Sequence, residues 1–125
     1  MARHTALAEA LLPDRLERAV AAEPRAVFCC VSDRNGYVSA VNAAWAQPQR
    51  PGDAEWNARH CRNRRIFDDR AGILAARNTR PHFAQTYVLD LDGGQLALLK
   101  EIDCPITVTG RHWGALRFAL RLGGG

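Results

Sequence analysis

The sequence predicts an α+β fold with one antiparallel β-sheet of about five strands, an N-terminal helix, and short helices in an insertion between strands 2 and 3. Three observations predict it. Runs rich in β-branched and aromatic residues occupy 26–41 and 82–121, and helical patterns occupy 2–24 and 53–77. Turn motifs that contain glycine separate successive strands. Strands grouped in this way are typical of antiparallel sheets.

Length and composition limit the number of domains and the class of protein. The 125 residues suit one domain, which we place at 25–122, after a helical segment at 1–24 and before a flexible tail at 123–125. Hydrophobic residues make up 47% and charged residues 24%, which excludes a disordered chain. We find neither a signal peptide nor an apolar run near the ~18 residues of a membrane helix. We therefore expect a cytoplasmic protein without a membrane partner.

The N-terminal segment predicts helices. Residues 2–12 are rich in Ala and Leu, and Pro13 suits the first turn of a second helix. In that second helix Leu16, Ala19 and Val20 share one face because of their i, i+3, i+4 spacing. We expect this face to pack on the sheet.

The first two strands are predicted to form a hairpin. The strings AVFCCVSD and YVSAVN flank a turn at Asn35-Gly36. Gly36 is expected to be structural, because glycine adopts the left-handed backbone that such turns need. Cys29 and Cys30 are neighbours on one strand, so their side chains should point to opposite faces.

Two short helices are predicted in the insertion. Asp53 follows a Pro-Gly turn and is placed to cap a helix that contains Trp56. Asp69 is placed to cap a second helix over 71–77. Trp45 lies just before the first of them.

Three strands are predicted after the insertion. In the string HFAQTYVLDL, Phe83, Gln85 and Tyr87 share one face, and an Asp92-Gly93-Gly94 turn follows. In the next run, QLALLKEIDCPITV, Pro105 predicts a bulge or break. One face of that run carries Leu96, Leu98, Lys100 and Ile102. After a turn at 109–111, the last strand sets Leu116, Phe118 and Leu120 against Arg117 and Arg121.

The net charge of +4 is concentrated in one segment. Between Arg59 and Arg80, seven Arg residues stand against Asp68 and Asp69, a local charge of +5, so the rest of the chain sums to −1. Such a segment can contact phosphates, and the nearby tryptophans could stack on bases. No nucleic-acid-binding motif accompanies it, so we expect no nucleic-acid partner.

Several strings resemble a known family in their order along the chain. They are DRNGYV at 33–38, RNRRIFDDRAG at 62–72, LAARNTRP at 74–81, QTY at 85–87 and GRHWGALR at 110–117. Together they resemble a Cache/PAS-like sensory domain found in proteobacterial methyl-accepting chemotaxis proteins, over roughly residues 25–122. One departure is Val41 before Asn42, where members of that family often carry His.

The resemblance implies a non-enzymatic sensory domain of chemotaxis and signal transduction, with a small-molecule ligand bound between sheet and insertion. Arg64 or Arg65 would hold an anionic ligand through a bidentate contact. Asp68 and Asp69 are expected to be structural, as a helix cap and an Arg partner. The other expected ligand-binding residues are Phe67, Tyr87, Lys100 and Trp113, and Gly114 is expected to allow a close strand crossing.

The same resemblance implies an output through the N-terminal helix, to a second copy or to a signalling partner. Two alternatives stay open. A ligand-free structural or protein-interaction domain would fill the space between sheet and helices, whereas an enzyme would use Cys61 with His60 or His112. His112 could also ligate a metal or haem. We expect no cofactor or metal, because the four cysteines lack zinc-site spacing, and we expect the thiols to be reduced.

Overall fold

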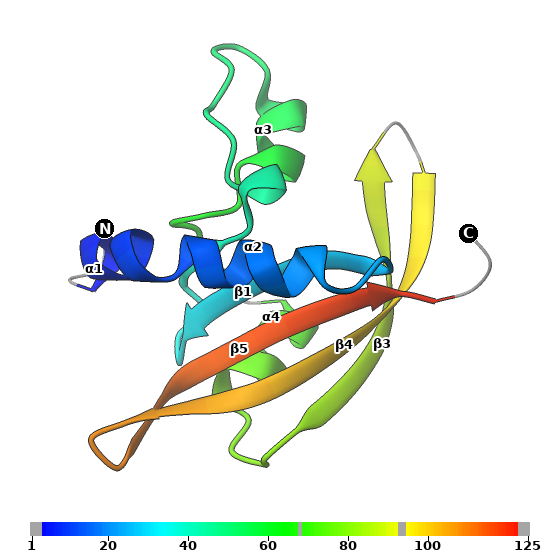
Figure 1. Cartoon of the computed structure of the whole chain (residues 1–125). Helices are drawn as coiled ribbons and strands as arrows, with labels where there is room; N and C mark the ends of the chain where they lie inside the picture. Colours follow the sequence, from blue (N-terminus) through cyan, green and yellow to red (C-terminus); the bar gives the residue numbers. More distant parts are fainter. Residues whose placement is uncertain (1–3, 68, 93–94, 123–125) are drawn as a thin grey trace.

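The computed structural model describes residues 4–67, 69–92 and 95–122, and over these ranges it confirms the α+β class. Five strands form one antiparallel sheet in the order β2-β1-β5-β4-β3 (Figure 1). The expected tail at 123–125, Asp68 and the two glycines of the turn at 92–94 lie outside the described residues. The elements are α1 (Thr5–Leu11), α2 (Pro13–Ala21), β1 (Ala26–Asp33), β2 (Val38–Val41), the 3-10 helix η1 (Ala43–Trp45), α3 (Ala54–His60), α4 (Arg70–Arg77), β3 (Phe83–Asp92), β4 (Gln95–Val108) and β5 (Arg111–Arg121).

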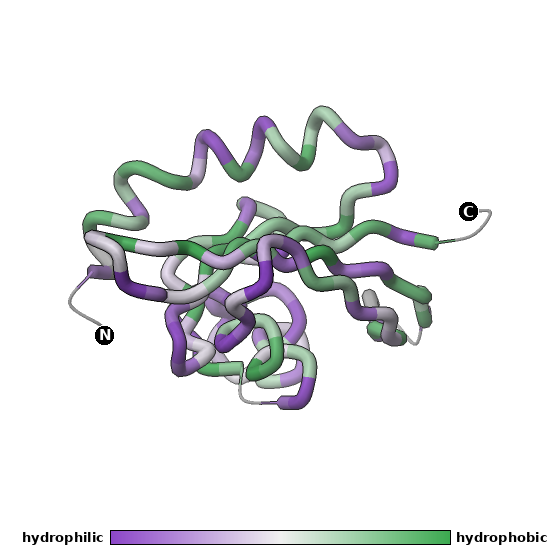
Figure 2. The backbone as a smooth tube through the Cα atoms, turned by 90° about the horizontal axis from the view of Figure 1, so that it is seen from below, coloured by the Kyte–Doolittle hydropathy of each residue, from purple (hydrophilic) through white to green (hydrophobic). Residues whose placement is uncertain are grey.

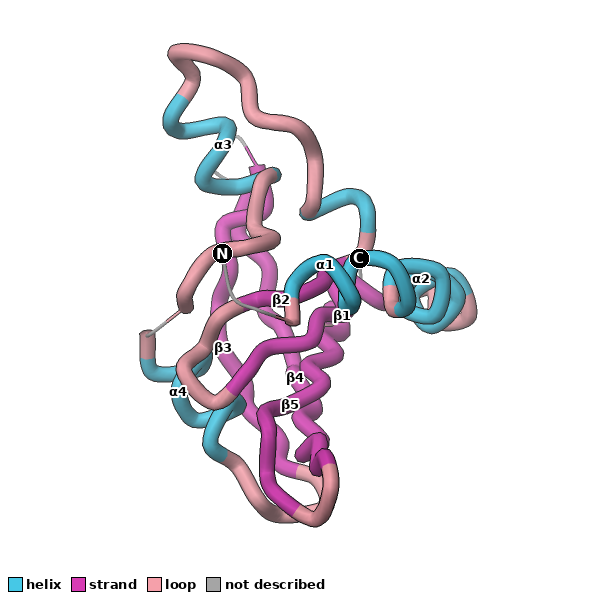
Figure 3. Tube along the Cα trace, turned by 90° about the vertical axis from the view of Figure 1, so that its left-hand side faces the viewer, coloured by secondary structure: helices cyan, strands magenta, loops and turns pink. Residues whose placement is uncertain are grey.

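Different parts of the chain cover the two faces of the sheet. Helices α1 and α2 lie over β1 and β2 on one face, and α4 lies against β4 and β5 on the other (Figure 3). We call the face toward α2 the outer face and the face toward α4 the inner face. Figure 2 shows the two N-terminal helices and the insertion on opposite sides of the strands. Because side chains alternate along a strand, every strand contributes to both faces.

The outer face packs against α2 as expected. Leu16 is buried in a cluster with Cys29 of β1, and Ala19 and Val20 pack against the same cluster. The spacing of these apolar side chains therefore predicted the contact face of the helix correctly. Cys30, the next residue along β1, belongs to a separate buried cluster. The two neighbouring thiols thus point to opposite faces.

The predicted hairpin forms, and its turn also positions the insertion. The carboxylate of Asp33 accepts the backbone N–H groups of Asn35 at 2.9 Å and Tyr37 at 3.1 Å. Gly36 has a φ of +83°, and a Cβ there would lie only 2.4 Å from the carbonyl oxygen of Phe67. Glycine is therefore required twice at this position, for its backbone conformation and for the close approach of the insertion.

The two helices of the insertion form where they were expected. Asp53 caps α3, with its side chain accepting the N–H of Trp56 at 3.1 Å. Asp69 occupies the N-cap position of α4, but among the described residues its side chain makes no capping hydrogen bond. The position was predicted correctly, whereas the cap interaction is absent.

A bulge or a break was expected at Pro105; strand β4 does not break there, and an irregularity in its ladder lies just beyond the proline. Pro105 pairs with Ala115 of β5, and the irregularity in the ladder comes one residue later, between Ile106 and Thr107. Strand β3 pairs with β4 no further than Asp103. Beyond that point β4 is an edge strand on its β3 side, where a missing N–H costs no ladder hydrogen bond.

Part of the outer face is not covered by the N-terminal helices. Val88, Leu96 and Leu98 on β3 and β4 are exposed, because α2 lies over β1. Lys100 shares this face and is exposed too. The predicted alternation of β4 is confirmed, and its opposite, inner face carries the buried Leu99 together with two carboxylates described below.

Candidate functional site

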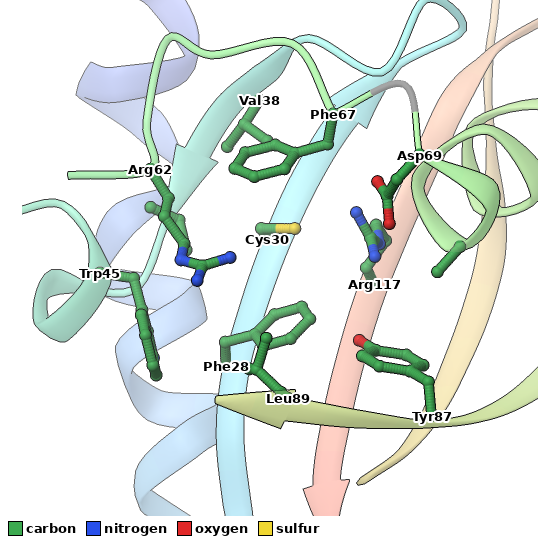
Figure 4. Close-up of a pocket in the computed structure, with 12 residues that line it drawn as sticks. Phe28, Cys30, Val38, Trp45, Arg62, Phe67, Asp69, Tyr87, Leu89 and Arg117 are labelled. Atoms are coloured by element: carbon green, nitrogen blue, oxygen red, sulfur yellow. The ribbon is translucent and has the colours of Figure 1, made fainter. Parts of the chain in front are cut away.

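A cavity of about 80 Å³ lies between the inner face of the sheet and the insertion (Figure 4). Side chains from β1, β2, β3 and β5 face the cavity from the sheet. Residues of η1, of the segment between α3 and α4, and of the first turn of α4 face it from the insertion. Its apolar lining consists of Phe28, Val38, Val41, Trp45, Phe67, Ala71 and Leu89. Its polar groups come from Cys30, Arg62, Asp69, Tyr87 and Arg117.

The structure brings two of the expected ligand-binding residues, Phe67 and Tyr87, to this cavity. Lys100 and Trp113 lie elsewhere. Lys100 is exposed on the outer face of β4. Trp113 packs on the outer core near α2, with its ring 4.9 Å from that of His4.

Neither of the two expected clamp residues, Arg64 and Arg65, is among the residues that line the cavity. The guanidinium of Arg64 makes a bidentate pair with Glu9 of α1, at 2.6 Å and 2.9 Å. The backbone of Arg64 has a positive φ of 62°, so its side chain leaves the segment in a different direction from its neighbours. Arg65 is exposed and donates to the carbonyl oxygen of Ala58 at 2.9 Å.

Arg62 is the arginine of this segment that reaches the cavity. Its Nε donates to the carbonyl oxygen of Arg59 at 3.0 Å, which leaves the outer nitrogens facing the open space (Figure 4). Burial lowers the pKa of Arg62, and the nearby charge of Arg65 adds to the effect. Within the described ranges, no carboxylate lies at ion-pair distance from its guanidinium.

A row of stacked side chains holds Arg62 in place. The guanidinium of Arg50 lies 3.7 Å from the ring centre of Trp56, and that ring stacks on His60 with centres 4.5 Å apart. His60 in turn lies parallel to Trp45 at 6.5 Å, and Arg62 lies 5.1 Å from the Trp45 ring. Cation–π contacts of this kind contribute about 0.5–2 kcal/mol each, depending on exposure. The row extends from the insertion's exposed loop to the cavity.

The indole of Trp45 is also anchored to the sheet. Its Nε1 donates to the carbonyl oxygen of Val27 at 2.8 Å. The apolar wall beside Arg62 is therefore fixed at one end by β1 and at the other by the stack. Such a wall is preorganised, so little side-chain order has to be created when a ligand binds.

A buried polar network supports the cavity from the sheet side. Arg117 donates to both oxygens of Glu101, at 2.8 Å and 2.9 Å. Tyr87 donates its hydroxyl to Glu101 at 2.5 Å, and the amide of Gln85 donates to Asp103 at 2.9 Å. Glu101 and Asp103 are fully buried. The network therefore fixes the positions of the two side chains, Tyr87 and Arg117, that line the cavity.

The pKa values of the two carboxyl groups in this network are shifted in opposite directions. Burial raises the pKa of Asp103 to about 8, and its hydrogen bond and charge interaction with Glu101 act in the same direction. Burial also raises the pKa of Glu101, but hydrogen bonds from Asp103, Arg117 and Tyr87 outweigh it and hold that pKa below its usual value. At neutral pH the pair therefore holds one proton, mainly on Asp103.

The surroundings of the cysteine thiols and of His60 are defined by burial and stacking. Burial raises the pKa of Cys30 to about 12, so the thiol in the cavity is neutral at physiological pH. The buried thiol of Cys61 lies near the amide of Asn57, while the ring of His60 stacks between tryptophans. All four cysteines fall within the described ranges and are free thiols, as expected.

The part of the chain that the structure describes contains no group of three or more His, Cys, Asp or Glu side chains able to hold a metal ion. None of its helices combines the length and apolar character needed to cross a membrane. Comparisons with protein-family models, with curated proteins and with solved structures found no match for the chain.

Sequence reasoning missed four charged residues of the site: Arg62, Glu101, Asp103 and Arg117. It also did not assign to the site Phe28, Cys30, Val38, Val41, Trp45, Ala71 and Leu89, which line the cavity. A signal for two of the charged residues was present in β4. Once its apolar Leu-Leu-Ile face is assigned, the alternation of a strand places Glu101 and Asp103 together on the opposite face. Two carboxylates on a buried strand require a cation or a proton, and this requirement points to a partner such as Arg117.

Proposed function

We propose that this protein is a small-molecule-binding sensory domain whose ligand occupies the cavity between the inner face and the insertion. The observation that carries the proposal is the cavity itself, which remains open although Phe28, Trp45 and Phe67 surround it. Cavities reduce stability, so a domain with a purely structural role is expected to fill such a space. An apolar enclosure with a few converging polar groups is typical of ligand sites.

Contacts of the insertion supply a route from ligand to N-terminal helices. Arg62 borders the cavity, and two residues later Arg64 pairs with Glu9 of α1. The same segment is tied to β2, since Arg64 N–H donates to Val38 O and Val38 N–H donates to Arg65 O, both at 2.8 Å. A ligand that orders this segment would shift the equilibrium position of α1, which is the proposed output element.

The partner of the output element is proposed to bind at α1. Leu7 and Leu11 on this helix are 64% and 62% exposed, which suits a second copy of the chain or a signalling partner. A role in chemotaxis is proposed from the sequence resemblance, and a cytoplasmic location from the expectation of reduced thiols. Size-exclusion chromatography with light scattering tests the homodimer: a wild-type monomer at all accessible concentrations would exclude it.

The ligand proposal is tested by thermal unfolding in the presence of a library of small organic acids, amides, amines and nucleotides. A ligand present at one hundred times its Kd stabilises the folded state by about 2.7 kcal/mol, which raises the Tm by several degrees in a domain of this size. We expect at least one small molecule to do so. If no member of the library raises the Tm, the binding proposal fails.

Filling the cavity supplies the matched test. Ala71→Leu adds three carbons at a position that lines the cavity. We expect this variant to fold and to lose the ligand-induced rise in Tm. Ala21→Leu makes the same change at the exposed end of α2 and should respond as wild type does. Equal responses of wild type and Ala71→Leu would place the ligand elsewhere.

A protein-interaction domain is the second candidate, and one observation favours it. The uncovered outer face of β3 and β4 exposes Val88, Leu96 and Leu98, and exposed apolar side chains that cluster often mark a binding surface. Replacing Leu98 by Asp distinguishes the two functions. The substitution would abolish an interaction at this face, whereas ligand binding on the inner face would be preserved.

A further inference from the structure

The charges that line the cavity are unevenly compensated. Arg117 is paired with both oxygens of Glu101, so these two groups together add no net charge. Asp69, at the exposed start of α4, also lines the cavity, and in Figure 4 it lies on the side of Arg117 and not on that of Arg62. Arg62 is half-buried, and no described carboxylate neutralises it. On its Arg62 side the cavity therefore presents a positive charge that no described carboxylate pairs with, among largely apolar side chains.

The geometry of Arg62 is that of a prepared anion site. Its Nε is occupied by the carbonyl oxygen of Arg59, and no acceptor among the described residues takes the outer nitrogens. Rings of Trp45 and Phe67 lie 5.1 Å and 5.7 Å from the guanidinium carbon and restrict its movement. Figure 4 shows the guanidinium to the left of Cys30, between Phe67 at the top of the view and Phe28 at the bottom. A planar, fixed guanidinium presents paired N–H donors that match the two oxygens of a carboxylate.

The size and lining of the cavity limit the rest of the ligand. About 80 Å³ is roughly half the ~150 Å³ that accommodates a benzene ring in an engineered protein cavity, so the body of the ligand is short. Phe28 and Leu89 provide apolar surface below Arg62 in the view of Figure 4. A phosphate or a dicarboxylate would leave charged oxygens against these side chains without partners, which is costly.

We propose that the cavity binds a short-chain monocarboxylate of about three to five carbons. Its carboxylate pairs with Arg62, and its aliphatic chain lies over Phe28 and Leu89. This inference rests on the proposed function and adds the chemical class of the ligand to it. Arg62 is thereby the residue that selects an anion over a neutral molecule of the same shape.

The test uses the indole N–H signals of the three tryptophans in ¹H–¹⁵N spectra, with butyrate, butyramide and butylammonium as probes. The three probes have similar size and differ in the charge of the head group. Trp45 lines the cavity, whereas Trp113 packs on the outer face and serves as an internal control. Butyrate is expected to shift the Trp45 signal, to leave the Trp113 signal in place, and to bind at least tenfold more tightly than butyramide.

A substitution at Arg62 then tests whether this residue causes the preference for an anionic ligand. Arg62→Gln is expected to reduce butyrate affinity at least tenfold and to bring the butyrate-to-butyramide ratio close to one. Arg70→Gln removes the same charge from an exposed position next to the cavity and should bind both probes as wild type does. If Arg62→Gln does not fold, the comparison of the three probes on the wild-type protein decides the ligand class without it.

The outcomes separate this inference from the proposed function. If butyramide or butylammonium shifts Trp45 as strongly as butyrate, the cavity binds ligand but the monocarboxylate class is overturned. If no probe shifts Trp45 while a library compound of another class raises the Tm, the class is overturned and the binding function stands. If neither probes nor library bind, both proposals fail. If Arg62→Gln binds butyrate as tightly as wild type does, Arg62 does not bind the carboxylate of the ligand.

Discussion

Asp103→Asn should stabilise this protein at neutral pH and remove much of its pH dependence between pH 5 and 7. Asp103 is fully buried and accepts a hydrogen bond from Gln85. Arg117 is already committed to Glu101. The network thus contains two carboxyl groups and one cation, and it avoids a buried net charge by keeping a proton on Asp103.

The sign and size of the effect follow from the pKa. The carboxyl group of Asp103 has an ordinary value of 3.8 and a folded-state pKa of about 8. Between these two values the unfolded chain has lost the proton that the folded protein retains. The stabilisation is therefore fully present below about pH 4 and is lost as the pH rises toward 8. The limiting slope is about 1.4 kcal/mol per pH unit, or about 3 kcal/mol between pH 5 and 7.

Urea unfolding of wild type and Asp103→Asn at pH 5, 6 and 7 measures this difference directly. An amide keeps the shape of the carboxyl group and does not titrate, so the gap between the two free energies of unfolding should widen as the pH rises. Because the two proteins differ at this one position, contributions from the rest of the chain cancel in the difference. Asp14→Asn, at an exposed position in the first turn of α2, is the control for removing one carboxylate. If the difference between the two free energies of unfolding stays constant with pH, Asp103 does not hold a proton in the folded protein.

Three further changes have defined outcomes. Glu101→Gln leaves the buried Arg117 without its anion and should destabilise the protein by about 3–5 kcal/mol in urea unfolding. Asp103→Asn, by contrast, is expected to stabilise it. Gly114→Ala should cost about 3 kcal/mol in the same assay, because the new Cβ would lie 2.0 Å from the carbonyl oxygen of Ser32. Thr109→Asn should raise the free energy of unfolding by about 0.5–1 kcal/mol, since φ is 53° there and Asn tolerates that backbone better. A loss of stability in this last variant would contradict the strain assigned to the turn.

The strand faces could be predicted because alternation is a local property. Phe83, Gln85 and Tyr87 were assigned to one face, and the structure places all three half-buried on the inner face. Two expected ligand-binding residues, Phe67 and Tyr87, accordingly line the cavity. Turn positions were predicted for the same reason, since a glycine such as Gly36 marks a backbone conformation that few other residues adopt.

The choice among neighbouring arginines could not be made from the sequence. Arg62, Arg64 and Arg65 lie within four positions, and the side chains of the insertion follow no regular period. Their directions are set by a left-handed residue at Arg64, by its ion pair with Glu9, and by stacking of Arg62 on Trp45. These partners lie 55 and 17 residues away along the chain. Only the folded chain brings them together.

The sequence by itself determined the order of the elements, the faces of the strands and the helix face that contacts the sheet, because each depends on residues a few positions apart. The tertiary structure alone decided which strand face encloses the cavity and which cation reaches it. It also decided that Glu101, Asp103 and Arg117 form one buried network, since this depends on the register between β4 and β5. Burial then set their charge states, because a low-dielectric interior admits a carboxylate only with a cation or a proton.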